Sequence, residues 1–124
     1  KEREEVYVIK SIYYADGRPY CINTSILPNK LFPKLELFDF NHNSLYEVLK
    51  SFYQLSFTKA RQILNATVGS SEIYGYLETE KNQPLLRINA TSFCLYHDNE
   101  TVFEIYESYI LTDILSYYVE KYNT

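Results

Sequence analysis

The residues that most often perform chemistry are sparse in this chain and do not gather into a reactive pattern. His42 and His97 each lie beside turn residues and share no metal-ligand spacing with each other or with Cys21 and Cys94. The two cysteines are too few and too far apart for a secreted disulfide framework, so we expect reduced, buried thiols. We therefore predict no catalytic residue, no metal site and no cofactor, and we place both histidines in surface loops.

Hydroxyl, amide and aromatic side chains are instead abundant and suit the binding of a small polar molecule. The sequence has 14 tyrosines and 7 phenylalanines, with no tryptophan or methionine. A tyrosine combines a rigid apolar ring with a polar tip, which suits both strands and polar pockets. Four asparagines begin Asn-x-Ser/Thr triplets, which we attribute to chance because no signal peptide is visible. They are Asn23, Asn65, Asn89 and Asn99.

Size and charge limit the classes of function. A chain of 124 residues that is 46% apolar suits a single domain, residues 1–124, with its own core. The formal net charge is −4 and the lysines and arginines form no dense cluster, so direct binding to the DNA backbone is not expected. No apolar run is long enough to cross a membrane, and we expect a cytoplasmic protein.

The first half of the chain predicts a β-hairpin followed by a helix. Residues Val6–Tyr14 and Tyr20–Leu27 are rich in β-branched and aromatic side chains and flank the turn signal Ala15–Gly17. Ser44 and Glu47 form a capping-box pattern. Apolar residues recur behind it at helical spacing, so the helix is expected to begin at Ser44.

The second half predicts a strand, a short helix and a second hairpin. Leu55–Val68 is extended in pattern, and residues 69–77 offer a serine N-cap and a short helix. Pro84–Tyr96 and Thr101–Leu111 form two long strands around a turn at residues 97–99.

The order of these elements predicts an α+β fold. Hairpin, helix, strand, helix and hairpin in succession favour a mostly antiparallel sheet with helices on one face. Ile114–Val119 fits both a strand and a helical turn, and we favour a final strand.

Short turn and core motifs follow one another along nearly the whole chain. They are Ala15–Pro19, Ile26–Pro28, Leu31–Pro33, Ser44–Tyr46 with Leu49, Ala60, Leu77, Pro84–Ile88, Val102–Glu104 and Asp113. No single motif is specific, but their order and spacing resemble those of the UbiC transcription-regulator-associated (UTRA) domain. That domain is the C-terminal effector sensor of HutC-branch repressors in the GntR superfamily.

The resemblance implies a chorismate-lyase-like fold and a small-molecule effector, such as a sugar or a related metabolite. It also implies a homodimer formed through this domain. DNA would be contacted only through an N-terminal winged-helix domain that is absent from this chain.

Three positions differ from what the resemblance implies for a phosphate-binding pocket. Relatives that bind sugar phosphates carry two arginines, two residues apart, at the end of the first strand, both facing the pocket. Ser11 and Tyr13 occupy these positions, and Asn23 stands where the family has a pocket glutamate. Lys10 alternates to the opposite face, so we expect an uncharged polar effector.

Four positions keep the residue types of the family's pocket. Ser44 and Tyr46 match the serine and tyrosine at a helix start, which receive an anion or a sugar oxygen; Ser44 equally fits an ordinary cap. Glu104 matches a glutamate that accepts ligand hydroxyls or an amine, the alternative being a salt bridge at the rim. Tyr109 lies near the family's C-terminal pocket aromatic.

Other polar residues have a competing structural role. Core or edge packing competes with ligand contact for Thr91, Asn89, Tyr106 and Ser108. Pairing with a neighbouring carboxylate competes with an anion site for Arg61 and Arg87.

These observations support three hypotheses of function. The favoured one is a ligand-sensing and dimerisation domain of a bacterial repressor, in which effector binding changes DNA affinity allosterically. The second is a chorismate-lyase-like enzyme, although the expected cationic substrate clamp is neutral at Ser11 and Tyr13. The third is a degenerate domain used only for dimerisation, which would have an occluded pocket.

Overall fold

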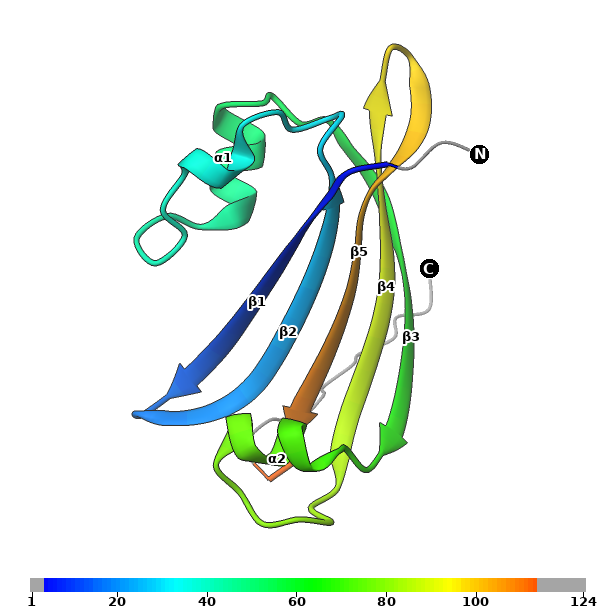
Figure 1. Cartoon of the computed structure of the whole chain (residues 1–124). Helices are drawn as coiled ribbons and strands as arrows, with labels where there is room; N and C mark the ends of the chain where they lie inside the picture. The colour runs from blue at the N-terminus through cyan, green and yellow to red at the C-terminus, as the bar shows by residue number, and fades with distance from the viewer. Residues whose placement is uncertain (1–3, 114–124) are drawn as a thin grey trace, which may run out of the picture.

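The computed structural model describes residues 4–113, which form one five-stranded sheet, two α-helices and a 3₁₀ turn (Figure 1). The elements are β1 (Val6–Ala15), β2 (Arg18–Pro28), η1 (Leu35–Leu37), α1 (Leu45–Ser51), β3 (Phe57–Thr67), α2 (Ser71–Leu77), β4 (Leu85–Tyr96) and β5 (Asn99–Leu111). The strands and helices predicted in this part of the chain are confirmed. The strand expected at Ile114–Val119 lies outside the described residues.

The strands pair antiparallel in the order β1-β2-β5-β4-β3. The predicted hairpins, β1-β2 and β4-β5, close through two-residue turns, Asp16–Gly17 and His97–Asp98, whose residues all have positive φ, as a type I′ turn requires. Because β5 returns beside β2, it joins the two hairpins into one sheet. The α+β fold and the largely antiparallel sheet are therefore confirmed.

α1 packs against one face of the sheet, which we call the α1 face. A buried cluster joins Val48 and Leu49 of α1 to Leu27 of β2 and Phe103 of β5, with Phe32 from the connecting loop. Burying one such side chain contributes about 1.5–3 kcal/mol. This cluster fixes the position of the segment that begins α1.

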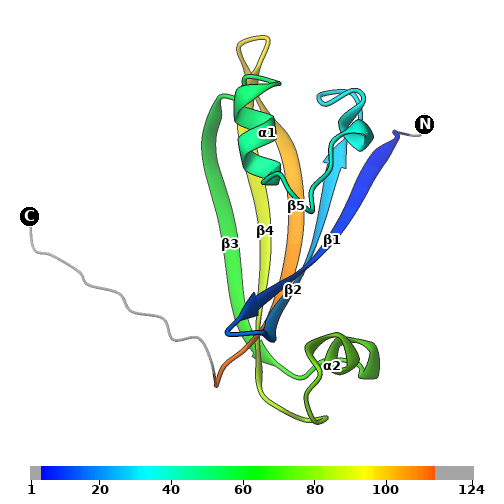
Figure 2. The same cartoon turned by 90° about the vertical axis from the view of Figure 1, so that its left-hand side faces the viewer.

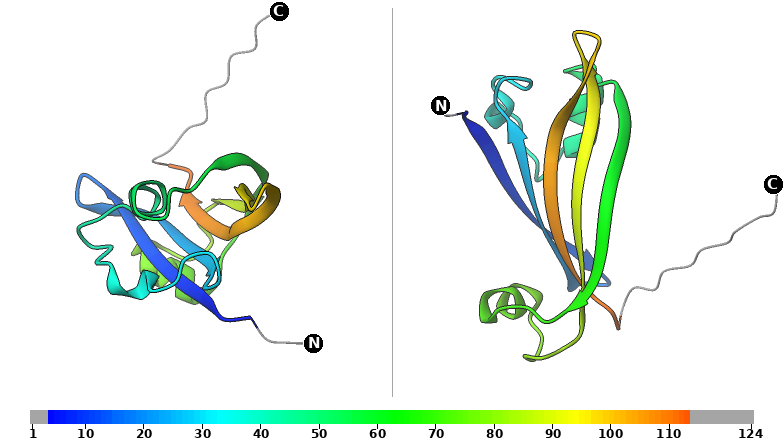
Figure 3. Two further views of the ribbon diagram at one scale, coloured as in Figure 1. Left: turned by 90° about the horizontal axis from the view of Figure 1, so that it is seen from above. Right: turned by 90° about the vertical axis from the view of Figure 1, so that its right-hand side faces the viewer.

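α2 packs near the opposite end of the strands (Figures 2 and 3) and on the opposite face, which we call the α2 face. It buries Tyr74 against Leu85 and Leu111. Along the paired strands, Leu27 shares a face with Tyr106, and the odd spacing from Tyr106 turns Leu111 to the other side. We expected both helices on one face of the sheet. Helical periodicity shows that a helix buries one apolar side, but it does not show which face of the sheet covers that side.

A β-bulge in β5 changes the alternation of side chains at the centre of the sheet. Ser92 pairs with Glu104 and Phe93 pairs with Val102, which leaves Phe103 without a cross-strand partner. Phe103 and Glu104 are both buried, and both contact α1 or its cluster. The bulge therefore brings an apolar and an acidic side chain to the same face at consecutive positions.

Leu49→Ala is expected to lower the free energy of unfolding by about 2–5 kcal/mol, because it leaves a cavity in the cluster under α1. Leu37→Ala is the matched control, since Leu37 is 75% exposed and Leu49 is 0% exposed. The control should change stability by less than about 0.5 kcal/mol. Urea unfolding measures both, and equal losses would contradict the described packing of α1.

Candidate functional site

A cavity of about 730 Å³ lies on the α1 face, between strands β1, β2 and β5 and the segment that leads into α1. Alternate side chains of the three strands form its floor. It is lined by Ile9, Lys10, Ser11, Ile12, Tyr13, Asn23, Ser25, Phe40, Asn41, Asn43, Ser44, Leu45, Tyr46, Glu104, Tyr106 and Ser108.

The strand register explains why the floor is polar. Asn23 pairs with Ser11 of β1 on one side and with Ser108 of β5 on the other. In the next row on the same face, Ser25 pairs with Tyr106. Because paired residues in a sheet point to the same side, these hydroxyl and amide groups gather in two adjacent rows.

Six of the residues singled out from the sequence border this cavity together. They come from four parts of the chain that are distant in sequence, and they include the uncharged positions Ser11, Tyr13 and Asn23. They are Ser11, Tyr13, Asn23, Ser44, Tyr46 and Glu104.

Tyr109 was expected in the pocket, and the structure corrects this. Ser108 faces the cavity, so its neighbour Tyr109 points to the α2 face, where it packs beside the buried Leu111. Its hydroxyl donates to Glu107 Oε2 at 3.3 Å, and that carboxylate also accepts from Arg87 Nε at 2.8 Å. The aromatic side chain that β5 supplies to the cavity is Tyr106.

Ser44 occupies the N-cap position of α1, but its side chain makes no capping hydrogen bond. The predicted capping box with Glu47 is therefore not formed. Ser70, by contrast, caps α2 by accepting from the Ile73 N–H at 3.3 Å. The hydroxyl of Ser44 is exposed at the cavity wall instead.

Glu104 is the charged group at the centre of the site. Glu104 is only 2% exposed, and Tyr46 donates a hydrogen bond to its Oε1. Burial, and then the bond to Glu104, raise the pKa of Tyr46 well above its usual 10.0. Glu104 lines the cavity, and Tyr46 is the hydrogen-bond donor that residues 4–113 supply to its carboxylate.

The neighbouring polar groups of the floor are bonded to one another. Ser108 Oγ donates to Asn23 Oδ1 at 2.5 Å, and Asn23 Nδ2 donates to Ser25 Oγ at 2.9 Å. Gln62 Nε2 donates to the Tyr106 hydroxyl at 2.7 Å. Glu104 therefore retains more unfilled hydrogen-bonding capacity than its neighbours, because a carboxylate accepts about four bonds.

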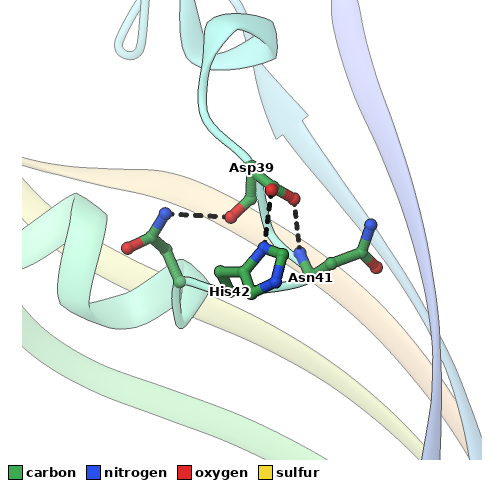
Figure 4. Close-up of polar contacts among 4 residues, drawn as sticks. Asp39, Asn41 and His42 are labelled. Carbon is green, nitrogen blue, oxygen red and sulfur yellow. Dashed lines mark hydrogen bonds and ion pairs between the residues drawn. The ribbon is translucent and has the colours of Figure 1, made fainter.

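Asp39 joins the residues of the loop that leads into α1 through polar contacts (Figure 4). Its carboxylate accepts from the Asn41 N–H at 2.9 Å and contacts His42 Nδ1 at 2.7 Å, and its carbonyl accepts from Asn43 Nδ2 at 3.0 Å. The contact with His42, followed by the Asn41 N–H, lowers the pKa of Asp39. His42 is itself exposed, as predicted, while Asn41 and Asn43 reach the cavity.

Sequence reasoning missed several lining residues and left the facing of others open. The cluster of asparagines beside Asp39 is a turn signal that could have placed Asn41 and Asn43 next to the helix start. The register now puts Tyr106 and Ser108 on the cavity side and Asn89 on the other. Arg87 pairs with a carboxylate, as the structural alternative predicted.

The charge at the cavity is dominated by Glu104. Lys10 borders the cavity, but its ammonium lies 5.5 Å from the centre of the Tyr76 ring of α2, on the other face. Within residues 4–113, no ion pair involves Glu104. The described surroundings of the carboxylate therefore leave its charge without a cationic partner.

Residues 4–113 contain no cluster of three or more histidine, cysteine, aspartate or glutamate side chains that would hold a metal ion. Cys21 and Cys94 are free and buried, as predicted, and burial raises the pKa of Cys21 to about 11. None of the helices found there has the length and apolar character needed to span a membrane.

Comparison with known families matches residues 1–116 to the UTRA domain. The chain belongs to the UTRA family. This UTRA domain is similar to the HTH-type transcriptional regulator YurK of Bacillus subtilis, itself uncharacterized, with 27% identity over 115 residues. The match covers 84% of this chain and 48% of YurK, so the chain spans about half the length of that relative.

Solved structures of regulator domains share the fold. The C-terminal domain of YurK superposes with a TM-score of 0.86 at 22% identity, covering 98% of this chain and 81% of that one. The effector domain of PhnF from Mycobacterium smegmatis gives 0.86 at 19% identity, covering 95% and 70%. A ligand-binding domain assigned to a GntR-family regulator of Bordetella bronchiseptica gives 0.80 at 29% identity, covering 97% and 76%.

Tyr46→Phe is expected to reduce the loss of stability at alkaline pH. The folded state keeps the Tyr46 proton because burial and Glu104 raise its pKa, whereas an unfolded tyrosine releases it near pH 10. The Tyr46 contribution is thus complete below pH 10 and is lost as the pH rises toward the raised pKa. Urea unfolding from about pH 8 to about pH 11 measures the difference.

The matched control is Tyr14→Phe, because Tyr14 is exposed and does not line the cavity. This variant should follow the wild-type curve. Parallel curves for wild type and Tyr46→Phe across the alkaline range would show that the Tyr46 environment is not as described.

Proposed function

We propose that this UTRA domain is the effector sensor of a bacterial transcriptional regulator and that it binds a small polar metabolite such as a sugar. The supporting observation is Glu104, a buried carboxylate that receives one donor from the described residues and lines a cavity rich in hydroxyl and amide groups. A buried carboxylate is stable only when donors or an opposite charge compensate for the lost water. Ligand hydroxyl groups would supply these donors, and the rings of Tyr13, Tyr46 and Tyr106 would contact the apolar faces of a sugar.

The effector is expected to carry no phosphate. Ser11 and Tyr13 border the cavity and carry no charge, so no bidentate arginine clamp exists at these positions. A phosphate would also face the negative charge of Glu104 in a partly buried site, where like charges repel more strongly than in water. The missing clamp and the repulsion by Glu104 both weaken the binding of a phosphorylated effector.

Control of DNA binding is proposed to occur in the full-length, cytoplasmic protein, through a homodimer and a separate DNA-binding domain. A ligand donor at Glu104 would bond the carboxylate that also holds the Tyr46 hydroxyl, and Tyr46 belongs to α1. Binding would thus change the contact that ties α1 to β5. A coupling of about 1–3 kcal/mol between the two sites is typical of such switches.

The alternative functions receive less support from the site. A lyase acting on an aromatic carboxylate would need a cation in the cavity, and the bordering Lys10 side chain is turned toward Tyr76. A domain used only for dimerisation would be expected to fill its pocket, whereas the cavity measures about 730 Å³. The similarity to proteins described as transcriptional regulators also favours a sensor.

A thermal-shift screen of sugars, sugar phosphates and organic acids tests the proposal. A neutral sugar or a similar polyol should give the largest stabilisation, roughly 2.7 kcal/mol at a hundred times its dissociation constant. Glu104→Gln should weaken its binding by at least about tenfold, or about 1.4 kcal/mol. Glu47→Gln, an exposed neighbour of Tyr46 outside the cavity, is the control. The proposal fails if no compound stabilises the domain or if the two variants bind alike.

Restoring the missing charges should change ligand preference. Ser11→Arg combined with Tyr13→Arg is expected to raise the affinity for the phosphorylated form of the sugar by about tenfold or more relative to the neutral form, because two guanidinium groups would face the cavity floor. Isothermal titration with the sugar and its phosphate measures the ratio. The double change Ser11→Gln and Tyr13→Gln controls for size, and a gain shared by that variant would contradict the charge argument.

A further inference from the structure

A second cavity of about 400 Å³ lies on the α1 face beside the first. Its lining is mainly apolar and includes Leu55, Phe57 and Ala60, together with the ring systems of Tyr46 and Tyr106. Phe57 is 57% exposed, although large apolar side chains are stabilised by leaving water. The described residues thus leave apolar surface open at this point of the sheet.

The cavity exists because two facing positions carry small side chains. Ala60 of β3 pairs with Ser92 of β4, and both line the cavity. Larger aromatic side chains surround these two residues, so the sheet surface is hollowed at Ala60 and Ser92. A planar apolar group placed on this floor would contact aromatic rings on its sides, an arrangement that adds about 0.5–1.5 kcal/mol per ring pair beyond area burial.

The two cavities share a pair of lining tyrosines. Tyr46 and Tyr106 line both of them. Each ring is held by its hydroxyl, since Tyr46 donates to Glu104 and Tyr106 accepts from Gln62. A molecule bound beside Glu104 would therefore have apolar space on the far side of these rings, within the same face of the sheet.

We infer that the second cavity is an apolar subsite of the effector, which takes an aromatic or alkyl substituent attached to the polar group held beside Glu104. The inference rests on the proposed sensor function and narrows the ligand class to amphiphilic molecules such as aryl or alkyl glycosides. The polar part donates hydrogen bonds in the first cavity. The apolar substituent covers Ala60 and packs against Phe57 in the second.

The first arm of the test maps the subsite with phenol alone by backbone amide NMR of this 124-residue chain. Phenol at millimolar concentration should shift the amide signals of Leu55, Ala60 and Ser92. Ala60→Phe should abolish these shifts, because the added ring fills the floor of the subsite. Ala66→Phe is the matched control: Ala66 lies on the same strand and face, is exposed, and lines neither cavity.

The second arm compares methyl and phenyl glycosides of the same sugars by isothermal titration. The phenyl member of a pair should bind at least about tenfold more tightly, and Ala60→Phe should remove this advantage while leaving methyl glycoside binding unchanged. Ala66→Phe should behave as wild type. Circular dichroism and thermal unfolding of both variants establish that they are folded.

The outcomes separate the subsite from the sensor function. Phenol shifts together with a phenyl advantage that only Ala60→Phe removes would support the inference. Absence of phenol shifts, or equal binding of methyl and phenyl glycosides, would overturn it even where polar sugars still bind beside Glu104. A change in oligomeric state caused by Ala60→Phe, without any phenol binding, would show that a second copy of the chain covers this surface and would also overturn it.

Discussion

A carboxylate that leaves water must receive donors or a positive charge, and much of this domain's arrangement follows from how Glu104 meets that requirement. The protein supplies one donor, the hydroxyl of Tyr46, and thereby links the helix α1 to the central strand β5. The same carboxylate lines the cavity. A buried carboxylate with unfilled acceptor sites serves as a binding group, because a ligand can donate the hydrogen bonds that the protein does not supply.

The sequence predicts the elements of this fold better than the faces that they cover. Alternating strands and turn residues at 16–17 and 97–98 locate both hairpins, since a two-residue loop with positive φ admits few other structures. The side on which α2 lies depends on contacts with Leu85 and Leu111, where apolar residues occupy both faces of the strand ends. Periodicity alone does not resolve that choice.

The same limit applies to the candidate site. Matching residue types along the chain selects Ser11, Asn23 and Glu104, which line the cavity together, although Glu104 directly follows the bulge in β5. It misplaces Tyr109, where a shift of one residue reverses the face. It also predicts a capping box at Ser44, which stands at the N-cap position but makes no capping bond. The loop before it is organised by Asp39, whose bonds span only a few residues and follow no repeating pattern.

The bulge at Phe103 has a consequence for how such domains diverge. With the extra residue present, the apolar Phe103, which packs under α1, and the carboxylate of Glu104 lie side by side on one face of the sheet. Losing Phe103 in a descendant would restore regular pleating and leave Glu104 paired with Ser92 and facing the cavity, while the apolar anchor of α1 would be lost. A single codon deletion would thus loosen the helix that carries Tyr46 while the carboxylate of the pocket stays in place, so the shape of the cavity could change without a change of strand order.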